Sequence, residues 1–148
     1  MLEHKAKILI GANKNKTSVR VDQIIHDIAV IDTAIYLMKR DGLKLGEVIS
    51  DKEMQSKDGF ATRRHYPDFV FEERGDSYCV EVELSLKDKE KLAKNIKANF
   101  IDYDFQIWIV PKNDTHIRKG LKSAMDAHPN IAEVIDIESV REYVKQID

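Results

Sequence analysis

The chain has 148 residues, of which 43% are hydrophobic and 34% charged, and its formal net charge is −2. This composition is typical of a water-soluble globular protein and excludes an intrinsically disordered chain, and the length suits one domain with a single core. No apolar run is long enough to span a bilayer, the first residues lack the apolar stretch of a secretory signal, and Cys79 has no second cysteine to pair with. We therefore expect a cytoplasmic protein without membrane contact, in which Cys79 is a small packing residue.

The first half of the chain predicts a helix followed by a strand. Residues 1–20 contain several basic side chains and are interpreted as a basic arm or the remnant of a preceding domain, and residues 21–148 as a single domain. Residues 43–50 have the pattern of a strand, and the polar residues 51–65 are predicted to form a loop. Between 21 and 39, apolar residues recur at steps of four and three, which predicts one buried helix face formed by Ile24, Ile28, Ile31, Ile35 and Met38.

Residues 66–73 and 77–84 predict an antiparallel hairpin, with Gly75-Asp76 as its turn. This turn places Asp68 opposite Glu83 and Val70 opposite Glu81. Because strand side chains alternate between faces, one face of the hairpin is apolar and the other is acidic. The core face holds Phe69, Phe71, Tyr78, Val80, Val82 and Leu84, and the other holds Asp68, Glu72, Glu81, Glu83, Ser85 and Lys87.

The second half of the chain alternates helices and strands. Residues 105–110, FQIWIV, are almost all apolar, which is typical of a strand buried on both faces, with Trp108 in the core. The expected elements are a helix over 87–103 with Leu92, Ile96 and Phe100 inward, a helix beginning at Asp114 or Thr115, a strand over 131–137, and a terminal helix lined by Val140, Tyr143, Val144 and Ile147. The order α-β-β-β-α-β-α-β-α predicts an α/β fold, a three-layer mixed sheet in which an antiparallel hairpin leads into parallel crossovers.

The acidic face of the hairpin has two interpretations. Asp68, Glu81 and Glu83 point the same way, and facing carboxylates repel one another unless a cation neutralises them. Mg²⁺ or Mn²⁺ suits such oxygen ligands and would activate a water for phosphodiester hydrolysis, with Lys87 orienting the water or contacting the phosphate. The alternative is an exposed polar sheet surface. Glu47 is a further carboxylate with the same two interpretations, of which a surface position is favoured.

The element order and the motif together resemble the PD-(D/E)XK nuclease superfamily, whose fold is restriction-endonuclease-like. The matching residues are Pro67-Asp68 and, across the hairpin, Glu81-Val82-Glu83. The resemblance implies that Asp68 and Glu81 bind the catalytic metal. The third position of the motif is usually Lys and is Glu83 here, so the water-activating residue is open, with Lys87 as a candidate.

The string VEVELSLKDKEKLAKNI and the helix segment around His26 look like the nuclease-like domain of the replication-relaxation family. This resemblance implies a role in the replication or conjugative mobilisation of plasmids and other mobile elements. His26 itself is interpreted mainly as a structural residue of its helix, and a metal or phosphate role is the minority alternative.

Three classes of function remain open from the sequence. The first is a Mg²⁺- or Mn²⁺-dependent DNA endonuclease, and the second is a non-catalytic nuclease-like module that recruits DNA or a relaxase. The third is a toxin, immunity or regulatory protein that reuses the fold. The residues predicted to contact DNA are Arg63, Arg64, His65, Lys91 and Lys94.

Overall fold

A computed structural model of the chain describes residues 17–59, 64–86 and 88–147. The described residues form an open five-stranded mixed sheet and five α-helices. In chain order the elements are α2 (Thr17–Asp41), the 3-10 helix η2 (Leu45–Glu47), β1 (Ile49–Ser50), α3 (Asp51–Asp58), β2 (Phe69–Glu73), β3 (Asp76–Val82), α4 (Lys89–Asp102), β4 (Phe105–Val110), α5 (Thr115–Met125), β5 (Ile131–Asp136) and α6 (Ile137–Gln146). None of these helices is both long and apolar enough to cross a membrane.

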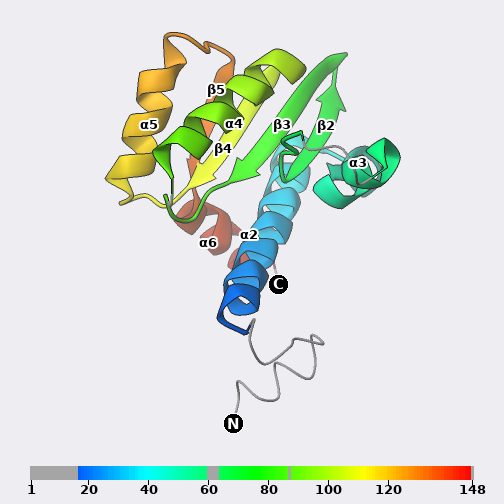
Figure 1. Ribbon diagram of the computed structural model, residues 1–148. Coiled ribbons are helices and arrows are strands. Elements are labelled where there is room, and N and C mark those ends of the chain that lie inside the picture. The colour runs from blue at the N-terminus through cyan, green and yellow to red at the C-terminus, as the bar shows by residue number, and fades with distance from the viewer. Residues whose placement is uncertain (1–16, 60–63, 87, 148) are drawn as a thin grey trace.

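The sheet has the strand order β1-β2-β3-β4-β5, with β1, β2 and β3 antiparallel in succession and β3, β4 and β5 parallel. Helices cover both faces, and Figure 1 shows α4 and α5 on one side with α2 and α6 on the other. One core lies between the sheet and α2 and α6, and the second lies between the sheet and α4 and α5. The expected α/β architecture of three layers, with a hairpin followed by parallel crossovers, is therefore confirmed.

Strand β4 separates the two cores. Ile107 and Ile109 pack into the core beneath α2 and α6, and Trp108 and Val110 pack into the core beneath α4 and α5. All four side chains are buried, and the indole of Trp108 donates a hydrogen bond to Gln106 Oε1 at 3.0 Å. The expectation of a strand buried on both faces is confirmed.

The segment from 43 to 65 differs from the prediction. The expected strand over 43–50 is reduced to the two residues of β1, because residues 45–47 turn as a 3-10 helix and leave Leu45 exposed. The expected loop contains α3, which begins where Ser50 accepts a hydrogen bond from the backbone N–H of Glu53 and ends at Gly59, whose φ is 85°. Only Met54 of this helix is buried, so its sequence has no apolar periodicity to reveal it.

The hairpin turn lies one residue earlier than predicted. Arg74 and Gly75 have φ values of 52° and 85°, and Glu73 pairs with Asp76. These are the positive φ values of a two-residue hairpin turn. The shift moves the pairing by two residues, so that Val70 lies opposite Cys79 rather than Glu81. A shift of two preserves the face of each side chain, and the predicted core face of Phe69, Phe71, Val80 and Val82 is confirmed.

In three helices, some residues that were predicted to be buried are exposed. In α2 the sheet-facing residues are Ala29, Thr33 and Leu37, whereas Ile28 and Ile31 are 53% and 57% exposed. In α4, Leu92 and Ile96 point inward as expected, but Asn99 takes the third inward position and Phe100 lies against the ring of His128 at the surface. In α6, Val140 is buried but Ile147, at the end of the helix, is exposed.

The turn geometry makes a testable prediction. No atom lies within 4 Å of a Cβ added at Gly75, so Gly75→Ala changes only the backbone preference and we expect it to lower the free energy of unfolding by about 1 kcal/mol. Gly46→Ala is the matched control, since its Cβ also meets open space and its φ is not positive. Urea unfolding of the two variants measures the difference, and equal stabilities would contradict the observed turn.

Candidate functional site

The candidate site lies where β3 ends and β2 begins. Asp68 precedes β2, and its backbone N–H donates to the carbonyl of Val80 at 3.1 Å. Its carboxylate Oδ2 accepts a hydrogen bond from the backbone N–H of Val82 at 2.7 Å. The two bonds hold Asp68 at the end of the β2–β3 ladder. Backbone structure therefore sets the orientation of this carboxylate.

His26 of α2 contacts both the carboxylate of Asp68 and the end of β3. Its Nε2 lies 3.3 Å from Asp68 Oδ1 and 3.1 Å from the carbonyl oxygen of Val82. The hydrogen bond to Asp68 outweighs the effect of burial and raises the pKa of His26 to about 9. The imidazolium form therefore predominates at neutral pH and compensates the charge of Asp68. The Nδ1 atom of His26 is buried without a hydrogen-bond partner, 3.7 Å from Asp27 Oδ1.

Glu81 is buried on the side of the sheet that α4 covers. Its Oε1 accepts a hydrogen bond from Asn99 Nδ2 at 2.9 Å and also contacts His65 Nε2. Burial raises the pKa of Glu81, and the contacts with His65 oppose that rise. The segment that leads into β2 and the inner face of α4 thus both supply a partner for one buried carboxylate.

Glu83 follows β3 directly, and its backbone N–H donates to the carbonyl of Ile109 at 2.9 Å. Its side chain is partly buried. Burial is the main cause that raises the pKa of Glu83, and the charges of Glu81 and Asp68 raise it further, whereas His26 and Lys91 lower it. The three predicted carboxylates therefore share one electrostatic environment, although the predicted pairing of Asp68 with Glu83 does not fit the observed register, which is shifted by two residues.

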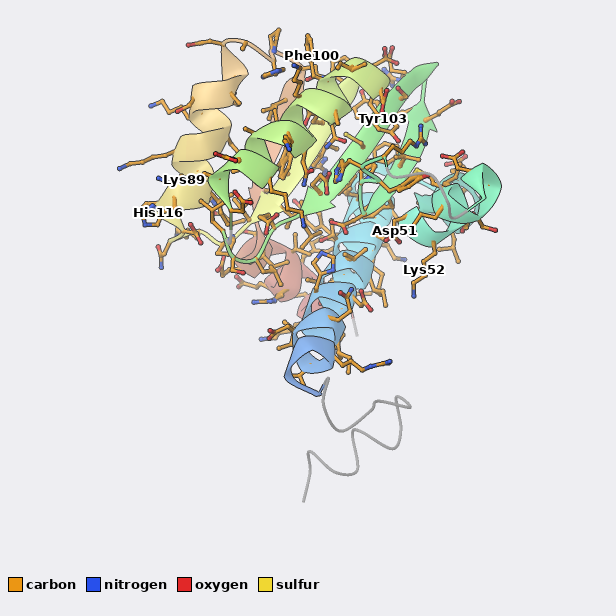
Figure 2. All side chains as sticks on the ribbon, viewed as in Figure 1. Asp51, Lys52, Lys89, Phe100, Tyr103 and His116 are labelled. Atoms are coloured by element: carbon orange, nitrogen blue, oxygen red, sulfur yellow. The ribbon has the colours of Figure 1, made fainter. Side chains whose placement is uncertain are left out.

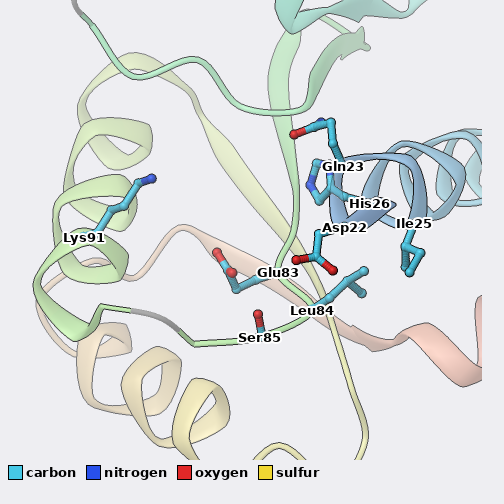
Figure 3. Close-up of a pocket in the computed structure, with 8 residues that line it drawn as sticks. All are labelled: Asp22, Gln23, Ile25, His26, Glu83, Leu84, Ser85 and Lys91. Carbon is cyan, nitrogen blue, oxygen red and sulfur yellow. The ribbon is translucent and has the colours of Figure 1, made fainter. Parts of the chain in front are cut away.

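A cavity of about 480 Å³ adjoins this cluster (Figure 3). Its walls come from the first half of α2, the residues that follow β3, and the first turn of α4. Figure 3 shows Lys91 on α4 facing Glu83 across the opening, with His26 on α2. The lining residues are Asp22, Gln23, Ile25, His26, Glu83, Leu84, Ser85 and Lys91. Carboxylates and cationic groups thus meet in one open cavity.

The other predicted site residues are placed as follows. His65 is half-buried against Glu81, so it belongs to the cluster rather than to an open surface. Arg64 is exposed, forms an ion pair with Asp58 at 3.0 Å and lies over the ring of Tyr66. Lys94 is exposed on α4.

The remaining predictions concern Glu47, Arg63, Lys87 and Cys79. Glu47 lies in η2, where its carboxylate accepts a hydrogen bond from the backbone N–H of Lys44. It is exposed there, as the favoured interpretation expected. Arg63 and Lys87 lie outside the described residues. Cys79 is fully buried, and burial raises the pKa of its thiol, in agreement with a packing role.

Sequence reasoning missed Asn99 and gave His26 only a minor role. Asn99 stands three residues after Ile96, where the helical pattern calls for an apolar residue. A polar residue at an inward helical position is the signal that would have indicated a buried partner. His26 has no comparable signal, because its contact with Val82 joins residues 56 positions apart in the sequence.

The fit of the cluster to a metal ion can be tested on its donor atoms. In residues 17–59, 64–86 and 88–147, no three His, Cys, Asp or Glu side chains are arranged to hold one ion. Asp68 and Glu81 are instead bonded by His26 and His65. A divalent cation would have to take these carboxylates from the histidines, so the described arrangement is not a preformed metal centre.

The His26–Asp68 pair predicts a pH dependence of stability. The folded-state pKa of about 9 lies above the ordinary value of 6.5, so the stabilisation is fully present below pH 6.5 and is lost as the pH rises through 9. Because His26 is partly solvent-screened, we expect a loss on the order of 1 kcal/mol across that interval. Urea unfolding at a series of pH values measures it.

Two variants test whether the pair causes this loss. His26→Gln removes the titrating group and Asp68→Asn removes its partner, so each is expected to flatten the profile between pH 6.5 and 9. A parent profile that is already flat, or variants that keep the parent's slope, would contradict the pairing.

Known proteins do not identify the chain. No family model, curated protein or solved structure matches it significantly. The resemblance to the PD-(D/E)XK superfamily and the replication-relaxation family therefore stays a prediction from the motif and the order of elements.

Proposed function

We propose that this chain is a nuclease-like domain that associates with DNA and acts in the replication or conjugative mobilisation of a plasmid or other mobile element. The observation that carries the proposal is the electrostatic proximity of Asp68 and Glu81 to Glu83, which lines a cavity together with His26 and Lys91. Cationic groups in an open cavity can bind the negative charge of a phosphodiester, and carboxylates beside them can bind the cations that accompany it.

The placement of the motif supports this proposal. Pro67-Asp68 comes directly before β2, Glu81 lies on β3, and α4 connects β3 to the parallel strand β4. These are the positions that the resemblance to the nuclease superfamily implies. The carboxylates also lie at the end of β3 where the chain leaves the sheet, which is where open α/β sheets commonly bind ligands.

Cationic side chains in and near the cavity supply the groups that would contact DNA phosphates. Lys91 lines the cavity, and His26 is protonated at neutral pH. Arg64 exposes its guanidinium near the segment that leads into β2. Phosphate contacts of this kind bind nucleic acid without reading its sequence, and their strength depends on salt.

The binding prediction follows from counterion release. We expect the parent to bind a short fluorescent DNA duplex at low salt, with an affinity that falls as salt rises. Lys91→Gln is expected to weaken binding and to reduce the log–log slope by about 0.9, the value for one lost phosphate contact. Lys145→Gln, on α6 at the opposite face of the sheet, is the matched control and should leave both unchanged.

Fluorescence anisotropy across a salt series measures both quantities. Binding that does not depend on salt would contradict the phosphate contacts. Absence of DNA binding at low salt would favour a protein partner such as a relaxase instead.

A second candidate function is divalent-metal-dependent cleavage of DNA. The specific observation that favours it is the shared environment of three carboxylates, two of which have pKa values raised by burial. Asp68 and Glu81, with Glu83 beside them, would hold Mg²⁺ or Mn²⁺ only after the ion displaced His26 and His65 from the first two carboxylates. A bound ion of this kind would supply an activated water and stabilise charge on the phosphate. Asn99 and the backbone of Val82 would keep the two carboxylates oriented.

The cleavage prediction uses supercoiled plasmid with Mg²⁺ or Mn²⁺. We expect nicked or linear product from the parent and none from Asp68→Asn or Glu81→Gln, with Glu72→Gln, an exposed carboxylate of β2, as the control. The ions are also expected to raise the melting temperature of the parent, because they bind the folded state alone. No product and no thermal shift at millimolar ion, with DNA present, would leave the non-catalytic module as the function.

A further inference from the structure

A second concave surface lies between α4 and α5. It is a groove of about 220 Å³, and its floor includes Leu92, Ala93 and Gly120. A Cβ placed on Gly120 would lie 2.8 Å from Leu92 Cδ2, so the two helices are in close contact there. The groove therefore has a rigid apolar base formed by packed helices.

Among the described residues that line this groove there is no carboxylate, and its rim carries lysines. Lys89 projects from the first turn of α4, and His116 and Lys119 project from the first turns of α5. Figure 2 labels Lys89 and His116 on these two neighbouring helices. Ser123 adds a hydroxyl to the same rim. Three nitrogen-bearing side chains and a hydroxyl around an apolar base suit an anion with several oxygens, such as a phosphate.

The helices around the groove are basic although the whole chain has a net charge of −2. Helix α5 contains no acidic residue, and α4 carries four lysines against Glu90 and Asp102. Arg118 of α5 is bonded to Asp136, which leaves Lys119 and Lys122 as the exposed cations of that helix. The positive charge is thus concentrated on one layer of the molecule, where it can attract a polyanion.

The N-termini of α4 and α5 are capped by aspartate side chains of the chain itself. Asp88 accepts hydrogen bonds from the backbone N–H groups of Glu90 and Lys91, and Asp114 accepts one from Ile117. These aspartates cap the first turns of α4 and α5 and use the N–H groups that would otherwise face a ligand. Binding in the groove therefore depends on the lysine and histidine side chains.

The groove adjoins the cavity of the candidate site. Ser85 and Lys91 line the cavity, whereas Leu86 and Lys89 line the groove. Both concave surfaces therefore use residues close to the start of α4.

We propose that the α4–α5 groove binds a backbone phosphate of duplex DNA that flanks the part of the duplex lying at the cavity. This inference rests on the proposed function, and it assigns Lys89, His116 and Lys119 to a contact separate from that of Lys91. The groove positions the duplex through its phosphates and does not read bases.

The test compares four proteins in the same anisotropy titration. They are the parent, the double variant Lys89→Gln/Lys119→Gln, the cavity variant Lys91→Gln, and the control Lys145→Gln. Lys89 and Lys119 are exposed, so the double variant is expected to fold, which circular dichroism and thermal unfolding check. We expect it to weaken binding about tenfold or more at low salt and to reduce the log–log slope by about 0.9, the value for the one phosphate contact that the groove makes.

A second pair of variants places a negative charge in the groove and on the opposite layer. Ser123→Glu introduces a carboxylate at the groove rim and is expected to weaken DNA binding, whereas Ser139→Glu on α6 is expected to leave it unchanged. Both serines lie on helices, so the two changes differ mainly in position.

The outcomes separate the groove from the proposed function. If Lys91→Gln weakens binding while the groove variants bind like the parent, the groove inference is overturned and the proposed function stands. If the parent binds no DNA at low salt, both fall. Tight binding of an RNA duplex of equal length, or of an acidic peptide, in place of DNA would overturn the assignment of the groove to DNA.

Discussion

The arrangement of the site follows from the cost of placing carboxylates inside a protein. Glu81 lies in the middle of a sheet beneath α4, where an unpaired charge would be strongly unfavourable. It is compatible with the fold because Asn99 and His65 reach it from two different segments. The charge of Asp68 is likewise stabilised, by a hydrogen bond from the N–H group of Val82 and by His26. The positions of α2, α4 and the segment before β2 are therefore coupled to two acidic side chains.

This coupling bears on how the carboxylates should be interpreted. Clustered acids were expected either to face solvent or to require a metal ion. The structure presents a third arrangement, in which each of two carboxylates has a histidine partner. Proton-bearing partners and a divalent cation compete for the same oxygen atoms, so an ion would act on a site that is already compensated. A DNA-binding module would need no rearrangement of such a site, whereas metal-dependent catalysis would require His26 and His65 to release the carboxylates.

Much of the fold could be predicted because its strongest signals are local. The run FQIWIV and the helix start at Asp114 or Thr115 depend on neighbouring residues only; the strand was located correctly, and Asp114 is the cap of the two alternatives. The face of each hairpin residue was correct although the register was not, since a shift of two residues preserves the alternation. Helix α3 was missed because it has a single buried residue, Met54, and so its sequence shows no apolar periodicity. The wrong face of α2 was predicted to be buried, because Ile28 and Ile31 are exposed and Ala29 and Leu37 are buried instead.

The candidate site was predictable to the same extent. Alternation alone placed Asp68, Glu81 and Glu83 together, but their partners could not be deduced. His26 and Asn99 meet the carboxylates through the packing of helices against the sheet, which depends on the whole core rather than on a motif. A histidine such as His26 has the same local sequence whether it faces a carboxylate or water, whereas Asn99 gives only the sign of a buried polar residue and not the identity of its partner.

The spread of the site along the chain has a consequence for folding. Its contacts join α2 to the end of β3, the segment before β2 to β3, and β3 to α4, so residues 26 to 99 must all be in place. Contacts of such sequence separation form late, because loop closure has to precede them. Partial opening that releases α2 or α4 from the sheet would take away His26 or Asn99 while the β2–β3 hairpin remained paired. Asp68 would then keep only the N–H group of Val82, or Glu81 only His65, so the chain can present a more acidic hairpin during synthesis or local unfolding than the native protein does.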